Sequence, residues 1–134
     1  MNIITEGELT AALLSDVADQ VTKQNVPVAQ YVDAANAFAG QYLEQVGCSY
    51  DSTVTGQEPP EQIKRYVIEI AHHRVAVATN LDKDYNTATG ESHLEKYAKY
   101  AMEYFKGLAT GKSVPPCARI NEILVPIGVE ECPD

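Results

Sequence analysis

The 134-residue sequence contains no apolar run approaching the ~20 residues that a membrane-spanning helix needs. Its first residues, Met1 to Glu6, also lack the basic start and the apolar core of a signal peptide. From these two absences we expect a protein of cytoplasmic origin. The length fits one domain that can bury a core, and the hydrophobic (45%) and charged (22%) fractions are ordinary for a globular protein.

Cysteine is scarce and scattered, with only Cys48, Cys117 and Cys132 and no Cys-x-x-Cys spacing. An odd number of widely separated cysteines is not typical of a disulfide framework or a zinc site. We therefore predict ordinary reduced thiols. His72 and His73 would project about 100° apart from one helix, so they cannot hold one metal ion together. The sequence thus predicts no metal site.

Basic residues are few: ten lysines and arginines stand against nineteen acids, for a net charge of −9. This argues against a protein that wraps nucleic acid, because such binding needs cationic surface to displace counterions. Residues 1–60 have eight acids and one base (−7), residues 61–112 seven acids and eight bases (+1), and residues 113–134 four acids and one base (−3). Neighbouring copies could attract each other through these regions, although a solvated acidic surface explains the charge equally well.

Helical spacing of apolar residues predicts an all-α fold, a small bundle of about four helices with long polar loops. The strongest signal spans residues 60–81 and opens at Pro60, which suits a first helical position. Its apolar positions extend beyond one stripe, so we expect neighbouring helices to cover it on more than one side and the helix to be central. These apolar positions are Ile63, Tyr66, Val67, Ile70, Ala71, Val75, Ala76, Val77 and Ala78. A second long helix is predicted from Pro27 to Val46, with Asn25 as its cap and Gly47 after its end.

Two capping-box patterns, Thr5 with Glu8 and Ser92 with Glu95, predict further helix starts. After Thr5 the pattern allows either one helix or two short ones with a restart at Ser15. The helix after Ser92 is predicted to end between residues 107 and 111, with this apolar face: Leu94, Tyr97, Ala98, Ala101, Phe105 and Leu108.

The last residues change character, because Pro115 and Pro116 prevent a helix from continuing. Residues 120–125 look strand-like, yet the predicted bundle offers no sheet for them to join. We therefore divide the chain into a helical domain, residues 1–113, and an extended, strand-like C-terminal arm, residues 114–134. This arm either folds back or is completed by another subunit.

No arrangement typical of an enzyme stands out, neither Ser/His/Asp nor Cys/His. The stretch from Gly107 to Ser113 superficially resembles a phosphate-binding P-loop. It follows a helix instead of a strand, its spacing is one residue short, and prolines come next. We therefore predict no catalytic residues, no cofactor-binding residues and no cofactor.

The order of several landmarks carries a family resemblance. A long helix precedes Pro59-Pro60, and the next helix contains Ile68-Glu69-Ile70-Ala71-His72-His73-Arg74. After a polar loop, another helix closes in Phe105-Lys106-Gly107-Leu108-Ala109-Thr110-Gly111-Lys112. Over residues 5–113 this resembles the head–tail connector proteins of long-tailed bacteriophages and prophages, also called adaptor or head-completion proteins. In them a "PP…I…IA…R" helix precedes a helix closing in "LK.IA.GK".

The resemblance implies a helical bundle that forms a homo-oligomeric ring beneath the portal protein and extends the DNA channel. It also implies a docking surface for the stopper or tail-completion protein, a location in the virion neck after assembly in the host cytoplasm, and no enzymatic activity. DNA would pass without specific binding, and no membrane is involved; an acidic ring suits such a channel. The alternative is a small helical partner-binding or regulatory module whose tail strand adds to a partner's sheet.

A closed ring requires a heterologous, head-to-tail interface. We expect the acidic helix from Pro27 to Val46 to face the helix that carries Lys96 to Lys106 in the next copy. Tyr100 is the best single interface candidate, because it lies off the predicted apolar face and tyrosine is enriched at interfaces. The other interface candidates are Lys96, Lys99, Asp33, Glu44, Ile123 and Val125.

Overall fold

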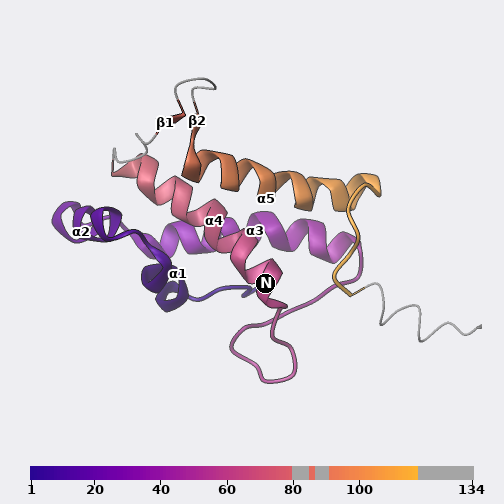
Figure 1. Cartoon of the computed structure of the whole chain (residues 1–134). Coiled ribbons are helices and arrows are strands. Elements are labelled where there is room, and N and C mark those ends of the chain that lie inside the picture. The colour runs from indigo at the N-terminus through magenta and orange to yellow at the C-terminus, as the bar shows by residue number, and fades with distance from the viewer. Residues whose placement is uncertain (80–84, 87–90, 118–134) are drawn as a thin grey trace, which may run out of the picture.

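The computed structural model describes residues 1–79, 85–86 and 91–117. In these residues the chain forms α1 (Glu6–Ala12), α2 (Ser15–Gln24), α3 (Val28–Gln45), α4 (Glu61–Ala78) and α5 (His93–Thr110). Two short strands, β1 (Tyr85–Asn86) and β2 (Glu91–Ser92), pair antiparallel just before α5. Helices α3 and α5 lie side by side, α4 crosses them, and α1 and α2 pack beside α4 (Figure 1). The predicted small all-α bundle is confirmed.

Helix α4 is the central helix, because it contacts α1, α2, α3 and α5. Ile63, Val67 and Ile70 are almost completely buried along it, and burying each side chain stabilises the fold by roughly 1.5–3 kcal/mol. The predicted apolar stripe is wrong in its last turn, since Val77 is 52% exposed. By the helical period Val77 lies on the same side of α4 as Tyr66, and the bundle leaves that side partly uncovered.

The amino-terminal region forms two helices, which decides between the two patterns that the sequence allows. The predicted capping box is present at the start of α1, where Thr5 Oγ1 accepts from the Glu8 N–H at 3.2 Å and Glu8 Oε1 accepts from the Thr5 N–H at 2.8 Å. Asn25 does not cap α3. It ends α2 in the left-handed region (φ 53°), a conformation that asparagine tolerates better than most residues.

One hydrophobic core joins the helices. Phe105 of α5 is fully buried and makes edge-on ring contacts with Phe38 of α3 and Tyr66 of α4. The segment before α1 also enters this core through Ile3 and Ile4, both almost completely buried. The chain's amino-terminal residues are therefore part of the packed structure.

Helix α5 ends in a tight reversal. Gly111 takes a left-handed conformation (φ 80°), and the N–H groups of Lys112 and Ser113 donate to the Gly107 carbonyl at 2.9 and 3.1 Å. The returning chain passes so close that a Cβ atom on Gly107 would collide with the Ser113 side chain. The glycine pattern that superficially resembles a P-loop is thus the C-terminal cap of a helix.

Cys48 and Cys117 form a disulfide bond, with an S–S distance of 2.04 Å, so the prediction of reduced thiols is wrong for these two residues. They are 69 residues apart in the sequence, which is why no local spacing rule identifies them. Helices α3 and α5 end on the same side of the bundle, and the chain after α5 crosses to the end of α3 (Figure 1). Cys132 and most of the predicted arm lie outside the described residues.

Candidate interaction site

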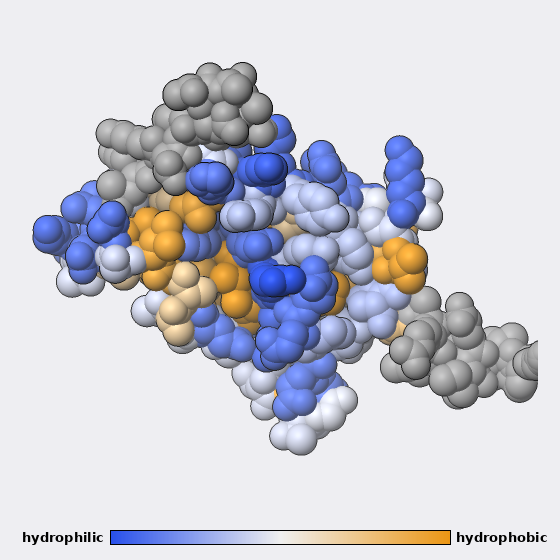
Figure 2. Space-filling view, viewed as in Figure 1, coloured by the Kyte–Doolittle hydropathy of each residue, from blue (hydrophilic) through white to orange (hydrophobic). Residues whose placement is uncertain are grey.

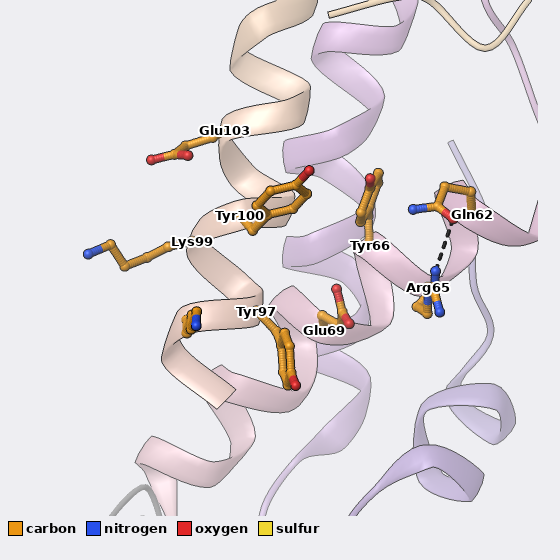
Figure 3. Close-up of a pocket in the computed structure, with 9 residues that line it drawn as sticks. Gln62, Arg65, Tyr66, Glu69, Tyr97, Lys99, Tyr100 and Glu103 are labelled. Atoms are coloured by element: carbon orange, nitrogen blue, oxygen red, sulfur yellow. Dashed lines mark hydrogen bonds between the residues drawn. The ribbon is translucent and has the colours of Figure 1, made fainter. Parts of the chain in front are cut away.

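An open groove of about 590 Å³ lies between α4 and α5 (Figure 3). We call it the tyrosine groove, and its lining residues are Gln62, Arg65, Tyr66, Glu69, Lys96, Tyr97, Lys99, Tyr100 and Glu103.

Helical spacing places these residues along two facing edges. Gln62, Tyr66 and Glu69 follow one another at four- and three-residue steps, so they share one side of α4. Lys96, Tyr100 and Glu103 repeat the same spacing on α5. One polar side of α4 and one polar side of α5 therefore border the groove, while the apolar sides of both helices face the core.

The tyrosines give the groove an exposed aromatic surface. Tyr100 is 66% exposed and Tyr97 is 52% exposed. The Tyr66 ring lies between the two helices, with its centroid 6.4 Å from that of Tyr100 and 5.0 Å from that of Tyr104 (Figure 3). The prediction that Tyr97 belongs to the apolar face of α5 is wrong, because Tyr97 stands at the edge of the buried stripe, where α4 does not cover it.

The aromatic cluster continues from the groove to the segment that follows α5. The Tyr104 hydroxyl donates a hydrogen bond to the Val114 carbonyl at 2.8 Å. Burial, together with the nearby Tyr66 and Tyr50, raises the pKa of Tyr104 to about 12. The phenol therefore stays protonated near neutral pH and remains a donor that holds the chain after α5 against the bundle.

The charged side chains of the groove are mixed, three basic and two acidic, for a net charge of +1. On α4, Arg65 Nη2 donates to Gln62 Oε1 at 3.0 Å (Figure 3). Burial raises the pKa of Glu69, and the positive charge of Arg65 opposes this shift. Lys99 and Glu103 extend from α5 away from α4 (Figure 3), so this helix presents charge both toward the groove and outward.

The structure brings three of the predicted interface residues, Tyr100, Lys96 and Lys99, together in the tyrosine groove. Asp33 and Glu44 lie elsewhere, on the exposed side of α3. Ile123 and Val125 lie outside the described residues. The α4 side of the groove, with Gln62, Tyr66 and Glu69, was not among the residues predicted from the sequence.

The exposed side of α3 carries small and acidic side chains. We call it the acidic stripe, and it comprises Asp33, Ala34, Ala37, Gln41 and Glu44. Helix α3 contains no lysine or arginine. Because α3 packs against both α4 and α5 and runs behind them in the view onto the tyrosine groove (Figure 3), the stripe and the groove face in opposite directions.

Exposed apolar side chains also occur outside the groove, among them Leu14, Val54, Val77 and Val114. In the view of Figure 2, hydrophobic residues near α1, α2 and α4 are separated by hydrophilic side chains. Among residues 1–79, 85–86 and 91–117, no three side chains are placed to hold a metal ion. In the same part of the chain, no helix is long and apolar enough to span a membrane.

No protein-family model, curated protein or solved structure matches this chain.

Proposed function

We propose that this protein is a structural head–tail connector. It forms a homo-oligomeric ring between the phage portal protein and the stopper or tail, and the ring extends the DNA channel in the virion neck. The observation that carries the proposal is the presence of two unlike surfaces, the tyrosine groove and the acidic stripe, on opposite sides of one small bundle.

Unlike surfaces on opposite sides suit a ring. A head-to-tail contact joins two different patches of the same protein, and a series of such contacts closes when the rotation between copies allows it. A symmetric dimer instead uses one self-complementary patch on both copies. The geometry of this bundle therefore favours repeated head-to-tail association.

Charge supports a particular pairing. The acidic stripe carries Asp33 and Glu44, while exposed Lys96, Lys99 and Lys106 lie along α5. Placing the stripe of one copy against α5 of the next brings opposite charges together, which speeds association and fixes the register. The small alanine side chains of the stripe permit a close approach between the two helices.

The overall charge is compatible with a channel for DNA. A net charge of −9 repels phosphates, so DNA slides through an acidic ring without sticking. In this role the protein acts as a mechanical connection and as a docking surface.

The mass of the protein in solution, measured by light scattering over a range of protein and salt concentrations, tests the proposal. We expect a large closed species that weakens with salt, either alone or with added portal protein as a template. The double variant Lys96→Glu/Lys99→Glu should weaken assembly, and so should Asp33→Lys/Glu44→Lys. Mixing or combining the two reversals should restore it.

Lys23→Glu is the matched control, because Lys23 is exposed on α2, away from both surfaces, and this change should leave assembly intact. A protein that stays monomeric alone and with portal protein would refute the ring. A stable dimer insensitive to the charge reversals would favour the partner-binding module instead.

A further inference from the structure

We infer that the tyrosine groove binds the carboxyl-terminal segment, residues 118–134, of a neighbouring copy of this chain. The inference rests on the proposed ring and names the occupant of one of its two surfaces.

The chemistries of the groove and the segment match. The groove combines exposed tyrosine rings with a net charge of +1. The segment carries four acids and one base, a net charge of −3. Its sequence also contains branched aliphatic residues that can pack on aromatic rings: Ile120, Ile123, Leu124, Val125, Ile127 and Val129. Apolar anchors in an aromatic groove with a complementary charged rim are the usual composition of a binding site for a peptide.

The point at which the segment begins favours a neighbouring copy. Cys117 is bonded to Cys48, which lies just after the last residue of α3, Gln45. The segment therefore starts at the end of α3, the helix that carries the acidic stripe. In the proposed ring this stripe lies against α5 of the next copy, so the segment starts next to that copy's groove.

The length of the segment is sufficient. Its 17 residues, counted from 118 to 134, can span up to about 56 Å when extended. Helix α5, with 18 residues, is about 27 Å long. A segment leaving the end of one α3 can thus follow the groove of the next copy along most of its length. Each copy would then hold its neighbour by the helix contact and by this segment.

A labelled peptide of residues 118–134, with Cys132→Ser, tests the inference when it is titrated into dilute full-length protein. We expect saturable binding that weakens with salt. Tyr100→Ala should reduce the affinity at least about tenfold, as expected for a central aromatic anchor. Val77→Ala is the matched control, since Val77 is also exposed on the bundle but does not line the groove.

Charge substitutions give a second pair of variants. Lys96→Glu should weaken peptide binding and flatten its salt dependence, whereas Lys106→Glu, exposed on the same helix but outside the groove, should change neither. Absence of binding, or equal binding by the wild type and Tyr100→Ala, would refute the groove as the site.

The full-length variant Ile123→Asp/Val125→Asp distinguishes a neighbour's segment from the chain's own. If the segment acts between copies, dilute wild type and this variant bind the peptide equally, because both grooves are empty. A much tighter complex with the variant would mean that the chain's own segment fills its groove, which would overturn the inference.

The same variant separates this inference from the proposed function. We expect it to need at least about tenfold more protein for assembly than the wild type, since one of two contacts is lost. Unchanged assembly would refute the segment's role while leaving the connector ring in place. Peptide binding without any ring, even with portal protein, would instead refute the connector.

Discussion

The side chain of Asn36 closes a pair of hydrogen bonds with the backbone of Ile4. The Ile4 N–H donates to Asn36 Oδ1 and Asn36 Nδ2 donates to the Ile4 carbonyl, both at 3.0 Å. Asn36 is only 5% exposed. Its side-chain amide therefore gives the buried N–H and carbonyl of Ile4 the hydrogen-bond partners that a neighbouring strand would give them in a sheet. This pair holds the segment before α1 in place while Ile3 and Ile4 fill the core.

Asn36→Ala should therefore destabilise the fold. The change leaves the buried N–H and carbonyl of Ile4 without partners, at a cost of about 1–3 kcal/mol for each unsatisfied group. Urea unfolding followed by circular dichroism measures the loss. Gln41→Ala, exposed on the same helix, is the control and should change stability by less than about 0.5 kcal/mol. A loss for Asn36→Ala as small as that of the control would mean that water replaces the amide.

His72 joins α4 to the junction between α1 and α2. The Leu14 N–H, at the start of α2, donates to His72 Nε2 at 3.2 Å. His72 is only 7% exposed. The bond requires a neutral ring, because a protonated imidazole has no free lone pair with which to accept it. Burial lowers the pKa of His72 below its ordinary value of 6.5, and the neighbouring His73 lowers it further.

Stability should consequently depend on pH through His72. Between the lowered folded-state pKa and 6.5 the unfolded chain binds more protons, so the free energy of unfolding is highest above pH 6.5 and falls below it. The slope contributed by one such group is at most about 1.4 kcal/mol per pH unit. His72→Gln keeps an acceptor without the titration, so urea midpoints at about pH 7.5 and about pH 5 should differ less for this variant than for the wild type. An equal difference in both proteins would assign the pH dependence to other groups.

Most of the helical architecture follows from local sequence patterns. The capping box at Thr5, the proline before α4 and the glycine after α3 identify helix ends because each acts on the backbone within one turn. The buried stripe of α4 is predictable for the same reason, since its period depends on one helix alone. Val77 and Tyr97 were predicted to lie on buried faces and are exposed. Their exposure depends on how α4 and α5 cross, and the apolar period of one helix gives no information about that crossing.

The candidate site was predictable only in part. Tyr100 could be recognised because it lies off the apolar face of its own helix, and Lys96 and Lys99 because they are charged and lie within four residues before it. The Tyr66 side of the groove could not be recognised from the sequence, because the contacts of Tyr66 with Tyr100 and Tyr104 depend on the packing of two helices. The Cys48–Cys117 bond could not be predicted for the same reason. It depends on the chain reversal at Gly111 and on α3 and α5 ending on the same side of the bundle.

This disulfide should contribute substantially to stability. In the chain-entropy description, closing a loop across a separation of 69 residues stabilises the folded state by about 4 kcal/mol. Reductant should lower the urea midpoint of the wild type by a corresponding amount, and Cys48→Ser/Cys117→Ser should match the reduced wild type and not respond further. Cys132→Ser, which leaves the bond intact, should respond to reductant as the wild type does.

A thiol titration of the unfolded, non-reduced protein checks the bond itself. The sequence contains three cysteines, so one free thiol is expected if Cys48 and Cys117 are joined, and three free thiols would contradict the bond. Because the bond also fixes where residues 118–134 begin, its loss should weaken assembly even at low temperature, where the bundle remains folded. Assembly that is unaffected by reductant would mean that the carboxyl-terminal segment reaches its site without being held at the end of α3.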